Sequence, residues 1–205
     1  SGAPGHEYWQ MQADYKMEIV VDDMQQKLSG SERITYYNNS PDVLSYLWVQ
    51  LDQNMRDEAS ASYSTVTNNP SDAAYSFFPN VLRDSVSGKE IQRIVSDYDY
   101  DGGYYITAVR GQDGKVRPYT INQTMMRVEL PEPLQPGQNY SFEIDWWYNI
   151  NDRMLVGGRS GYEYFPEDDN YLYTIAQFYP RMAVYDDVNG WQNKQFLGRG
   201  EFALP

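Results

Sequence analysis

Cysteine is absent from this 205-residue chain, and histidine occurs only once, as His6. The lack of cysteine excludes disulfides and thiolate metal sites, and it fits both reducing and oxidising compartments. Catalytic triads need a positioned imidazole, and catalytic zinc sites commonly use two or three histidines. One histidine near the start of the chain supplies neither, so we expect no catalytic centre and no tightly bound metal within this chain.

Long apolar runs and basic residues are also scarce. No stretch approaches the run of roughly eighteen apolar residues that a membrane helix requires. The 16 Lys and Arg stand against 29 Asp and Glu, which gives a net charge of −13. A surface this acidic repels phosphate backbones and anionic lipid headgroups, so we expect neither nucleic-acid binding nor membrane insertion. Catalysis by a pair of carboxylates stays open in principle, because the sequence does not fix their separation.

The size and composition are those of one globular domain. With 41% hydrophobic and 22% charged residues, the chain suffices for a single well-buried core. We therefore expect one domain over residues 1–205. Residues 1–7 are expected to be flexible or cloning-derived, because the start has neither the basic nor the apolar region of a signal peptide.

Apolar residues alternate with polar ones along much of the chain, which is the period of a β-strand. The run from Phe142 to Ile150 is the clearest, and Tyr15 to Val21 shows the same pattern. The segment 43–51 is apolar on both faces, which predicts a central strand covered on both sides. Further strands are expected around Ile34 and Tyr36, and at residues 91–98, 104–110, 126–130 and 172–178.

Turn and loop signals separate these predicted strands. The clearest are at residues 22–23, 38–42 and 111–114, and in the proline-rich loop 130–137. Residues 52–80 and 151–171 lack clear periodicity and are expected to be long loops, the first with a short helix. Many strands without alternating helices predict an all-β fold, either an antiparallel-rich saddle-shaped sheet or a sandwich.

Three carboxylates suggest a cation site. Asp97, Asp99 and Asp101 alternate along the chain and precede Gly102, as the ligands of a calcium loop do. The position that should carry the bidentate glutamate is Ala108, however, and the flanking segments are typical of strands rather than helices. Because alternating Asp and Tyr is also ordinary strand patterning, we favour a polar turn over a calcium site.

Aromatic residues are numerous, with 20 Tyr, 7 Phe and 5 Trp. An exposed group of them would suggest stacking against carbohydrate. Trp48, Trp146 and Tyr148 fall on apolar strand faces, where core packing is the usual role. A free-standing β-sandwich that binds a glycan or a protein partner is nevertheless one of two functions that the sequence leaves open.

The other function comes from a family resemblance. The chain resembles the N-terminal domain of the gluzincin aminopeptidases, the family of aminopeptidase N and leukotriene hydrolase, and in particular its bacterial branch. The most specific segment runs from Ile175 to Asp187 (IAQFYPRMAVYDD) and continues through Trp191 to Phe202. Other matching segments are YWQ at 8–10, DYKM at 14–17, YNNSPD at 37–42, LWVQLDQN at 47–54, the loop 130–137 and GRSGYEYF at 158–165.

The resemblance implies a β-rich, saddle-shaped domain that packs on a thermolysin-like catalytic domain holding zinc. The H-E-x-x-H and G-x-M-E-N motifs of that catalytic domain are absent here, so zinc and catalysis are expected only in a longer parent protein. The apolar ending at residues 200–205 also suggests a fragment. The expected partners are thus the protein's own downstream catalytic domain and peptide substrates, and the bacterial branch implies export to the periplasm or cell envelope.

The resemblance also implies one substrate-binding residue. In relatives, this domain walls the active-site cleft and supplies a side-chain amide or carboxylate that recognises the α-amine of the substrate. Gln177 matches that position, although it lies only three residues before Pro180, where many relatives have a longer spacing. Its amide oxygen can accept a hydrogen bond from an ammonium group. The competing interpretation is a glutamine that satisfies backbone groups beside a strand end.

A domain that packs on a catalytic partner should expose an apolar patch when it is alone. The aromatic tail of the chain is the surface that we expect to make this contact. The residues of this tail patch are Phe178, Tyr179, Met182 and Val184.

Overall fold

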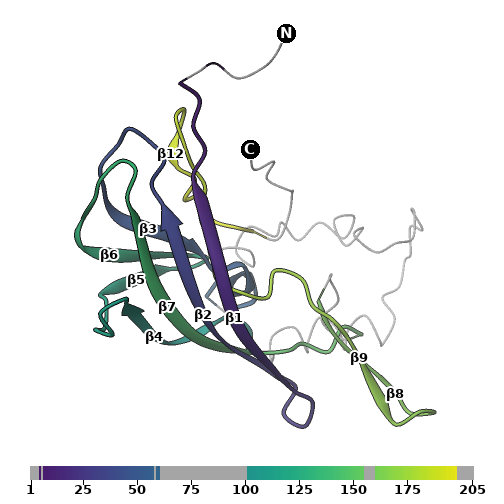
Figure 1. Ribbon diagram of the computed structural model, residues 1–205. Coiled ribbons are helices and arrows are strands. Elements are labelled where there is room, and N and C mark those ends of the chain that lie inside the picture. Colours follow the sequence, from purple (N-terminus) through teal and green to yellow (C-terminus); the bar gives the residue numbers. More distant parts are fainter. Residues whose placement is uncertain (1–4, 6, 58, 61–100, 155–159, 198–205) are drawn as a thin grey trace, which may run out of the picture.

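In the part of the chain that the structure describes, two four-stranded antiparallel sheets contribute to one hydrophobic core, and two short hairpins accompany them (Figure 1). The computed structural model describes residues 5, 7–57, 59–60, 101–154 and 160–197. The helical content of these ranges is one short 3-10 helix, η1 (Asp52–Arg56), and no helix in them is long and apolar enough to cross a membrane. The predicted all-β, antiparallel-rich fold is therefore confirmed, whereas the strand expected at 91–98 lies outside the described residues.

The first sheet has the strand order β1-β2-β7-β4. Its strands are β1 (Gln12–Asp22), β2 (Lys27–Tyr37), β7 (Asn139–Asn149) and β4 (Tyr105–Gly111). Every second residue of β7 from Tyr140 to Tyr148 is buried, which confirms the clearest pattern in the sequence. The predicted turn after β1 is also present, because the Asp22 carboxylate accepts hydrogen bonds from the backbone N–H groups of Met24 and Gln25, both at 3.0 Å.

The second sheet has the strand order β10-β3-β6-β5. Its strands are β10 (Arg181–Met182), β3 (Leu44–Gln50), β6 (Met125–Leu134) and β5 (Tyr119–Asn122). In β3, Leu47 and Val49 are fully buried, but Tyr46 and Trp48 on the opposite face are only half-buried. The prediction that this strand is covered on both sides is therefore only half right. Small apolar side chains in a strand indicate the face that meets the core. Large aromatic side chains also occur on the outer face of a sheet, so they do not show that this face is covered.

The proline-rich segment belongs to a strand and not to the predicted loop, which corrects the expectation for residues 130–137. β6 continues through Pro131 and Pro133 to Leu134. Its pairing with β3 shifts register between Leu44 and Tyr46, so the prolines lie where the ladder is interrupted. Proline lacks a backbone N–H group and is tolerated in a sheet at such irregular positions. The true turn is confined to residues 135–138.

The C-terminal part of the predicted loop 151–171 is a β-hairpin. It consists of β8 (Gly161–Phe165) and β9 (Asn170–Thr174) and extends away from the two main sheets (Figure 1). Exposed or half-buried tyrosines occupy both strands, so no buried apolar face marked them in the sequence. The strand predicted at 172–178 begins earlier and ends at Thr174. A last short hairpin joins β11 (Tyr185–Asp186) to β12 (Gly190–Trp191).

Core packing by tryptophan leaves no room for a side chain at Gly30 on β2. A Cβ atom there would lie 2.5 Å from Cζ2 of Trp146 and 2.8 Å from Cδ1 of Ile19. Trp146 is only 2% exposed, so its ring cannot move aside freely. We expect Gly30→Ala to lower the free energy of unfolding by about 1–3 kcal/mol, measured by urea denaturation. Ser29→Ala is the control for the strand itself, and equal stability of both variants would contradict this packing argument.

Candidate functional site

The segment that carries Gln177 is fastened to the fold through its backbone. The side-chain amide of Gln53, in η1, donates hydrogen bonds to the carbonyl oxygens of Ala176 at 3.0 Å and Gln177 at 3.1 Å. The hydroxyl of Tyr104 donates a further bond to the Gln177 carbonyl at 3.0 Å. Burial raises the pKa of Tyr104 well above its ordinary value, so this hydroxyl stays protonated and remains a donor.

Ser160 fixes the same segment from a third part of the chain. Its hydroxyl oxygen accepts the backbone N–H of Ala176 at 2.8 Å and lies 3.1 Å from the carbonyl oxygen of that residue. Gln53, Ser160 and Ala176 belong to three of the segments that carried the family resemblance. These segments are far apart in sequence, and the fold brings them together around Gln177.

A buried ion pair closes the other end of this segment. Asp52 of η1 is 1% exposed, and its Oδ2 atom accepts a hydrogen bond at 2.9 Å from Nε of Arg181. Burial raises the pKa of the Asp52 carboxyl, and the neighbouring guanidinium opposes that rise. This ion pair follows Pro180, and the Gln53 hydrogen bonds precede it. Together they attach the segment 176–181 to η1.

The 3-10 helix is itself held by Asn54. Its Oδ1 atom accepts the backbone N–H of Tyr104 at 2.7 Å, and its Nδ2 atom donates to the carbonyl of Gln123 at 2.8 Å. Both side-chain groups of this buried amide are thus used, which fixes η1 relative to the segments that precede β4 and β6. The backbone of Gln177 is consequently held by a network of buried and part-buried hydrogen bonds.

The Gln177 side chain, in contrast, is exposed. Its backbone lies in the left-handed region with φ 52°, an uncommon conformation for a residue other than glycine. The hydrogen bonds to its carbonyl stabilise this conformation, while the side-chain amide stays on the surface. An exposed amide on an anchored backbone has its carbonyl oxygen accessible to a hydrogen-bond donor on a ligand. The substrate-binding role of Gln177 stays a prediction.

The weak calcium candidate is only partly described by the structure. Asp97 and Asp99 lie outside the described residues. Asp101 is exposed, and its carboxylate accepts a hydrogen bond from the Tyr105 hydroxyl. Its backbone carbonyl accepts a bond from the Asn149 amide at 3.0 Å. Among the residues that the structure describes, no group of three or more His, Asp or Glu side chains is placed to hold a metal ion.

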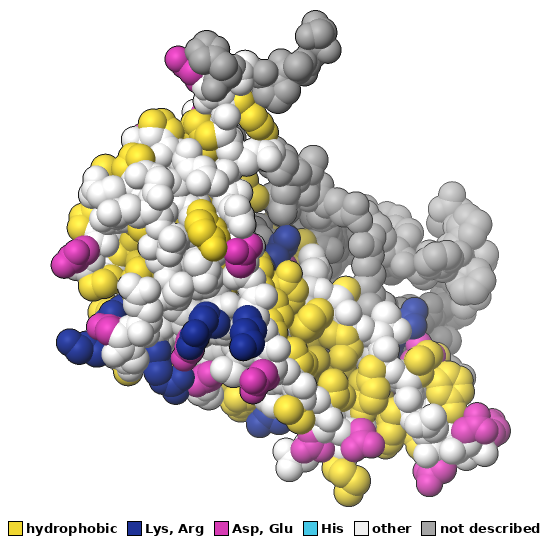
Figure 2. Space-filling view, viewed as in Figure 1, with side chains coloured by type: hydrophobic (Ala, Val, Ile, Leu, Met, Phe, Trp, Pro, Cys, Tyr) yellow, Lys and Arg dark blue, Asp and Glu magenta, His cyan; other side chains and the backbone are white. Residues whose placement is uncertain are grey.

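The predicted tail patch is wrong as an exposed surface. Met182 is 9% exposed and pairs with Val49 of β3, and Phe178 and Tyr179 pack against the core. Exposed apolar side chains occur on other elements, and Figure 2 shows hydrophobic side chains between β1 and the β8–β9 hairpin. The exposed apolar side chains on these three strands include Ile19, Val20, Val21, Tyr164, Phe165, Tyr171 and Leu172.

Three aromatic residues were predicted to lie in the core, and two of them do. Trp146 and Tyr148 are buried, as predicted, and Trp48 is half-buried. On the projecting hairpin, Tyr164 and Tyr171 contact each other with ring centroids 5.0 Å apart and planes tilted by 44°. These two rings therefore do not form the flat platform on which a sugar ring stacks.

Comparison with known proteins gives structural matches alone. No protein-family model and no curated protein sequence matches this chain. Solved structures do match, among them an M1 zinc metallopeptidase from Deinococcus radiodurans, with a TM-score of 0.40 and 13% identity over 75% of this chain. A variant of that metallopeptidase bound to a Tyr-Ser-Ala substrate matches with a TM-score of 0.40 and 14% identity over 75% of this chain.

A two-domain M1 zinc metallopeptidase variant bound to L-tryptophan gives a similar match. Its TM-score is 0.39, with 13% identity over 77% of this chain. The chain spans about a quarter of the length of these solved structures, since it covers 23% or 24% of each.

Proposed function

We propose that this chain is a non-catalytic β-domain of a zinc aminopeptidase, and that it walls the active-site cleft and helps to recognise the substrate's N-terminus. The observation that carries the proposal is the presentation of Gln177. Its side chain is exposed, while its backbone carbonyl is held by Gln53 and Tyr104. Zinc, a glutamate general base and the hydrolytic step belong, in this proposal, to another domain of the parent protein.

The proposed role of Gln177 follows from the chemistry of an exopeptidase. Such an enzyme must distinguish a free α-ammonium group from an internal peptide bond, and a side-chain oxygen does so by accepting a hydrogen bond from that ammonium. The partner surface in this proposal is the exposed apolar side chains of β1 and of the β8–β9 hairpin, since contiguous apolar surface marks contact sites. Export to a bacterial periplasm or envelope is part of the same proposal.

Substitution of Gln177 in the full-length enzyme tests this function. We expect Gln177→Ala to lower kcat/KM for an aminoacyl-nitroanilide about 10- to 100-fold, because a hydrogen bond to a charged group is worth roughly 1.5–3 kcal/mol. Gln177→Glu should retain binding of the ammonium group, whereas Gln177→Leu should not. The loss should be smaller for substrates with an acetylated N-terminus.

The matched control is Gln112→Ala, which removes another exposed glutamine on the turn after β4. Zinc content and melting temperature should stay near wild type in both variants, because each change is local to the surface. An unaltered kcat/KM for Gln177→Ala on a free-amine substrate would refute the proposed role.

A further inference from the structure

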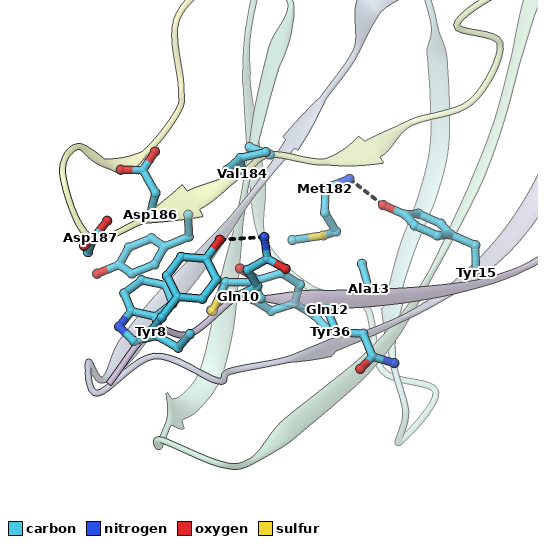
Figure 3. A pocket seen from close by; sticks show the side chains of 14 residues that line it. Tyr8, Gln10, Gln12, Ala13, Tyr15, Tyr36, Met182, Val184, Asp186 and Asp187 are labelled. Atoms are coloured by element: carbon cyan, nitrogen blue, oxygen red, sulfur yellow. Dashed lines mark hydrogen bonds between the residues drawn. The ribbon is translucent and has the colours of Figure 1, made fainter. Parts of the chain in front are cut away.

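A cavity of about 300 Å³ lies between the start of β1 and the segment 182–187 (Figure 3). This volume is at the lower end of the range of small-ligand pockets, roughly 300–1,000 Å³. Gln177 does not line it, so it is distinct from the surface considered above. Five aromatic side chains line this aromatic cavity, namely Tyr8, Trp9, Tyr15, Tyr36 and Tyr185.

The aromatic rings around the aromatic cavity are inclined to one another and are not all parallel. Trp191, behind the lining, is nearly parallel to Tyr36 at an interplanar angle of 28° and steeply inclined to Tyr185 at 70°. Because these two angles differ by 42°, the ring planes of Tyr36 and Tyr185 are inclined to each other by at least that angle. Trp9 stacks beside Tyr185, with centroids 6.0 Å apart. Inclined ring planes suit a compact, rounded ligand group. A planar ligand group would need two parallel rings to stack between.

The charges at the aromatic cavity have one sign. Asp186 and Asp187 are in its lining, at one end of the cavity in Figure 3, and the described lining contains neither Lys nor Arg. A hydrogen bond from the Gln192 side chain, together with backbone N–H groups, lowers the pKa of Asp186, so it is ionised at neutral pH. A third carboxylate, Asp42, accepts the Tyr185 hydroxyl at 2.7 Å. The negative charge of these carboxylates favours binding of a cation and disfavours binding of an anion.

The other side chains that line the aromatic cavity indicate that its ligand also has an apolar part. Met11, Met182 and Val184 offer apolar surface between the rings. Aromatic faces attract compact cations, and a methylene stem can lie along apolar side chains while its charged end reaches the carboxylates. We infer that the aromatic cavity binds an alkylammonium group of the kind that a lysine side chain carries. This site does not depend on the proposed function of Gln177.

Titration of the 205-residue chain with Nα-acetyl-L-lysine amide tests the site. The indole N–H signal of Trp9, assigned with Trp9→Phe, should shift saturably in nuclear magnetic resonance spectra, and added salt should weaken binding. The neutral isostere Nα-acetyl-L-norleucine amide should not saturate the same signal. n-Butylammonium should also bind if a free amine suffices, and its absence of binding would assign the site to lysine within a polypeptide.

Two exposed lining residues provide variants that should fold normally. Asp187→Asn and Tyr8→Ala should each weaken binding roughly three- to fivefold, as expected for one charge or one aromatic contact near the surface. Asp23→Asn, in the turn after β1, removes an exposed carboxylate of the same kind and should leave the affinity unchanged. Equal binding of the norleucine compound, an equal loss in Asp23→Asn, or no shift of the Trp9 signal would overturn the inference.

Discussion

Replacing Arg181 with methionine is expected to lower the free energy of unfolding by about 3 kcal/mol at pH 7, because it leaves a buried carboxylate without its cation. Asp52 is 1% exposed, and Arg181 binds its Oδ2 atom at 2.9 Å. The Oδ1 atom already lacks a hydrogen-bond partner among the described residues. We choose the lower end of the range for broken buried pairs, since the Arg181 side chain is itself 30% exposed.

The pH dependence separates this charge effect from lost packing. A protonated Asp52 needs no cation, so the loss in Arg181→Met should shrink as the pH falls towards 4, in agreement with the raised pKa of this carboxyl. The double variant with Asp52→Asn should recover most of the stability. Arg33→Met is the control, because Arg33 and Glu143 form an exposed pair that is worth about 0–1 kcal/mol. A loss in Arg181→Met that is equal at pH 4 and pH 7 would contradict the argument.

Glu32→Gln is expected to stabilise the protein at pH 7 by about 3 kcal/mol relative to its effect near pH 4.5. Glu32 lies on β2, is 1% exposed, and has no hydrogen-bond partner for either carboxyl oxygen among the described residues. Burial raises its pKa from 4.5 to about 9. The folded protein therefore keeps this group neutral at neutral pH, while the unfolded chain ionises it.

The direction of the effect follows from proton binding. Between pH 4.5 and 9 the folded state holds a proton on Glu32 that the unfolded state has released. The contribution of Glu32 to the free energy of unfolding is thus most favourable below pH 4.5, and it falls by up to about 1.4 kcal/mol per pH unit as the pH rises towards 9. Glutamine has no proton to lose, so the variant should lack this decline.

Urea denaturation of both proteins at several pH values measures this contribution directly. The difference between wild type and Glu32→Gln isolates Glu32 from the other titrating groups, including Asp52. Parallel stability curves between pH 5 and pH 8 would show that Glu32 is ionised in the folded protein and has found a partner there.

Local alternation was enough to predict much of the first sheet. In β7, a buried side chain at every second residue is required wherever one face of a strand meets the core. The same rule also places Glu32 in the inward row of β2, between Leu28 and Ile34. This buried acid was therefore readable from the sequence, although its polar character hides it from a search for apolar residues.

Elements that depend on distant partners were not predictable in this way. The prolines of β6 are tolerated because of an irregularity in its pairing with β3, which no local pattern records. The β8–β9 hairpin lacks a buried face and is stabilised by cross-strand pairs such as Tyr162 with Tyr173. The tail residue Met182 became core because β10 adds to the edge of β3.

By itself, the sequence determined the strand class, the acidic surface and the shortage of metal-binding and catalytic side chains, since these follow from composition and local period. The resemblance of its segments singled out Gln177. Only the tertiary structure decided how that residue is held, because Gln53 and Asp52 reach across 124 and 129 residues to Gln177 and Arg181. Such contacts form when segments far apart in the sequence pack together, and their energies depend on burial, which a linear sequence does not contain.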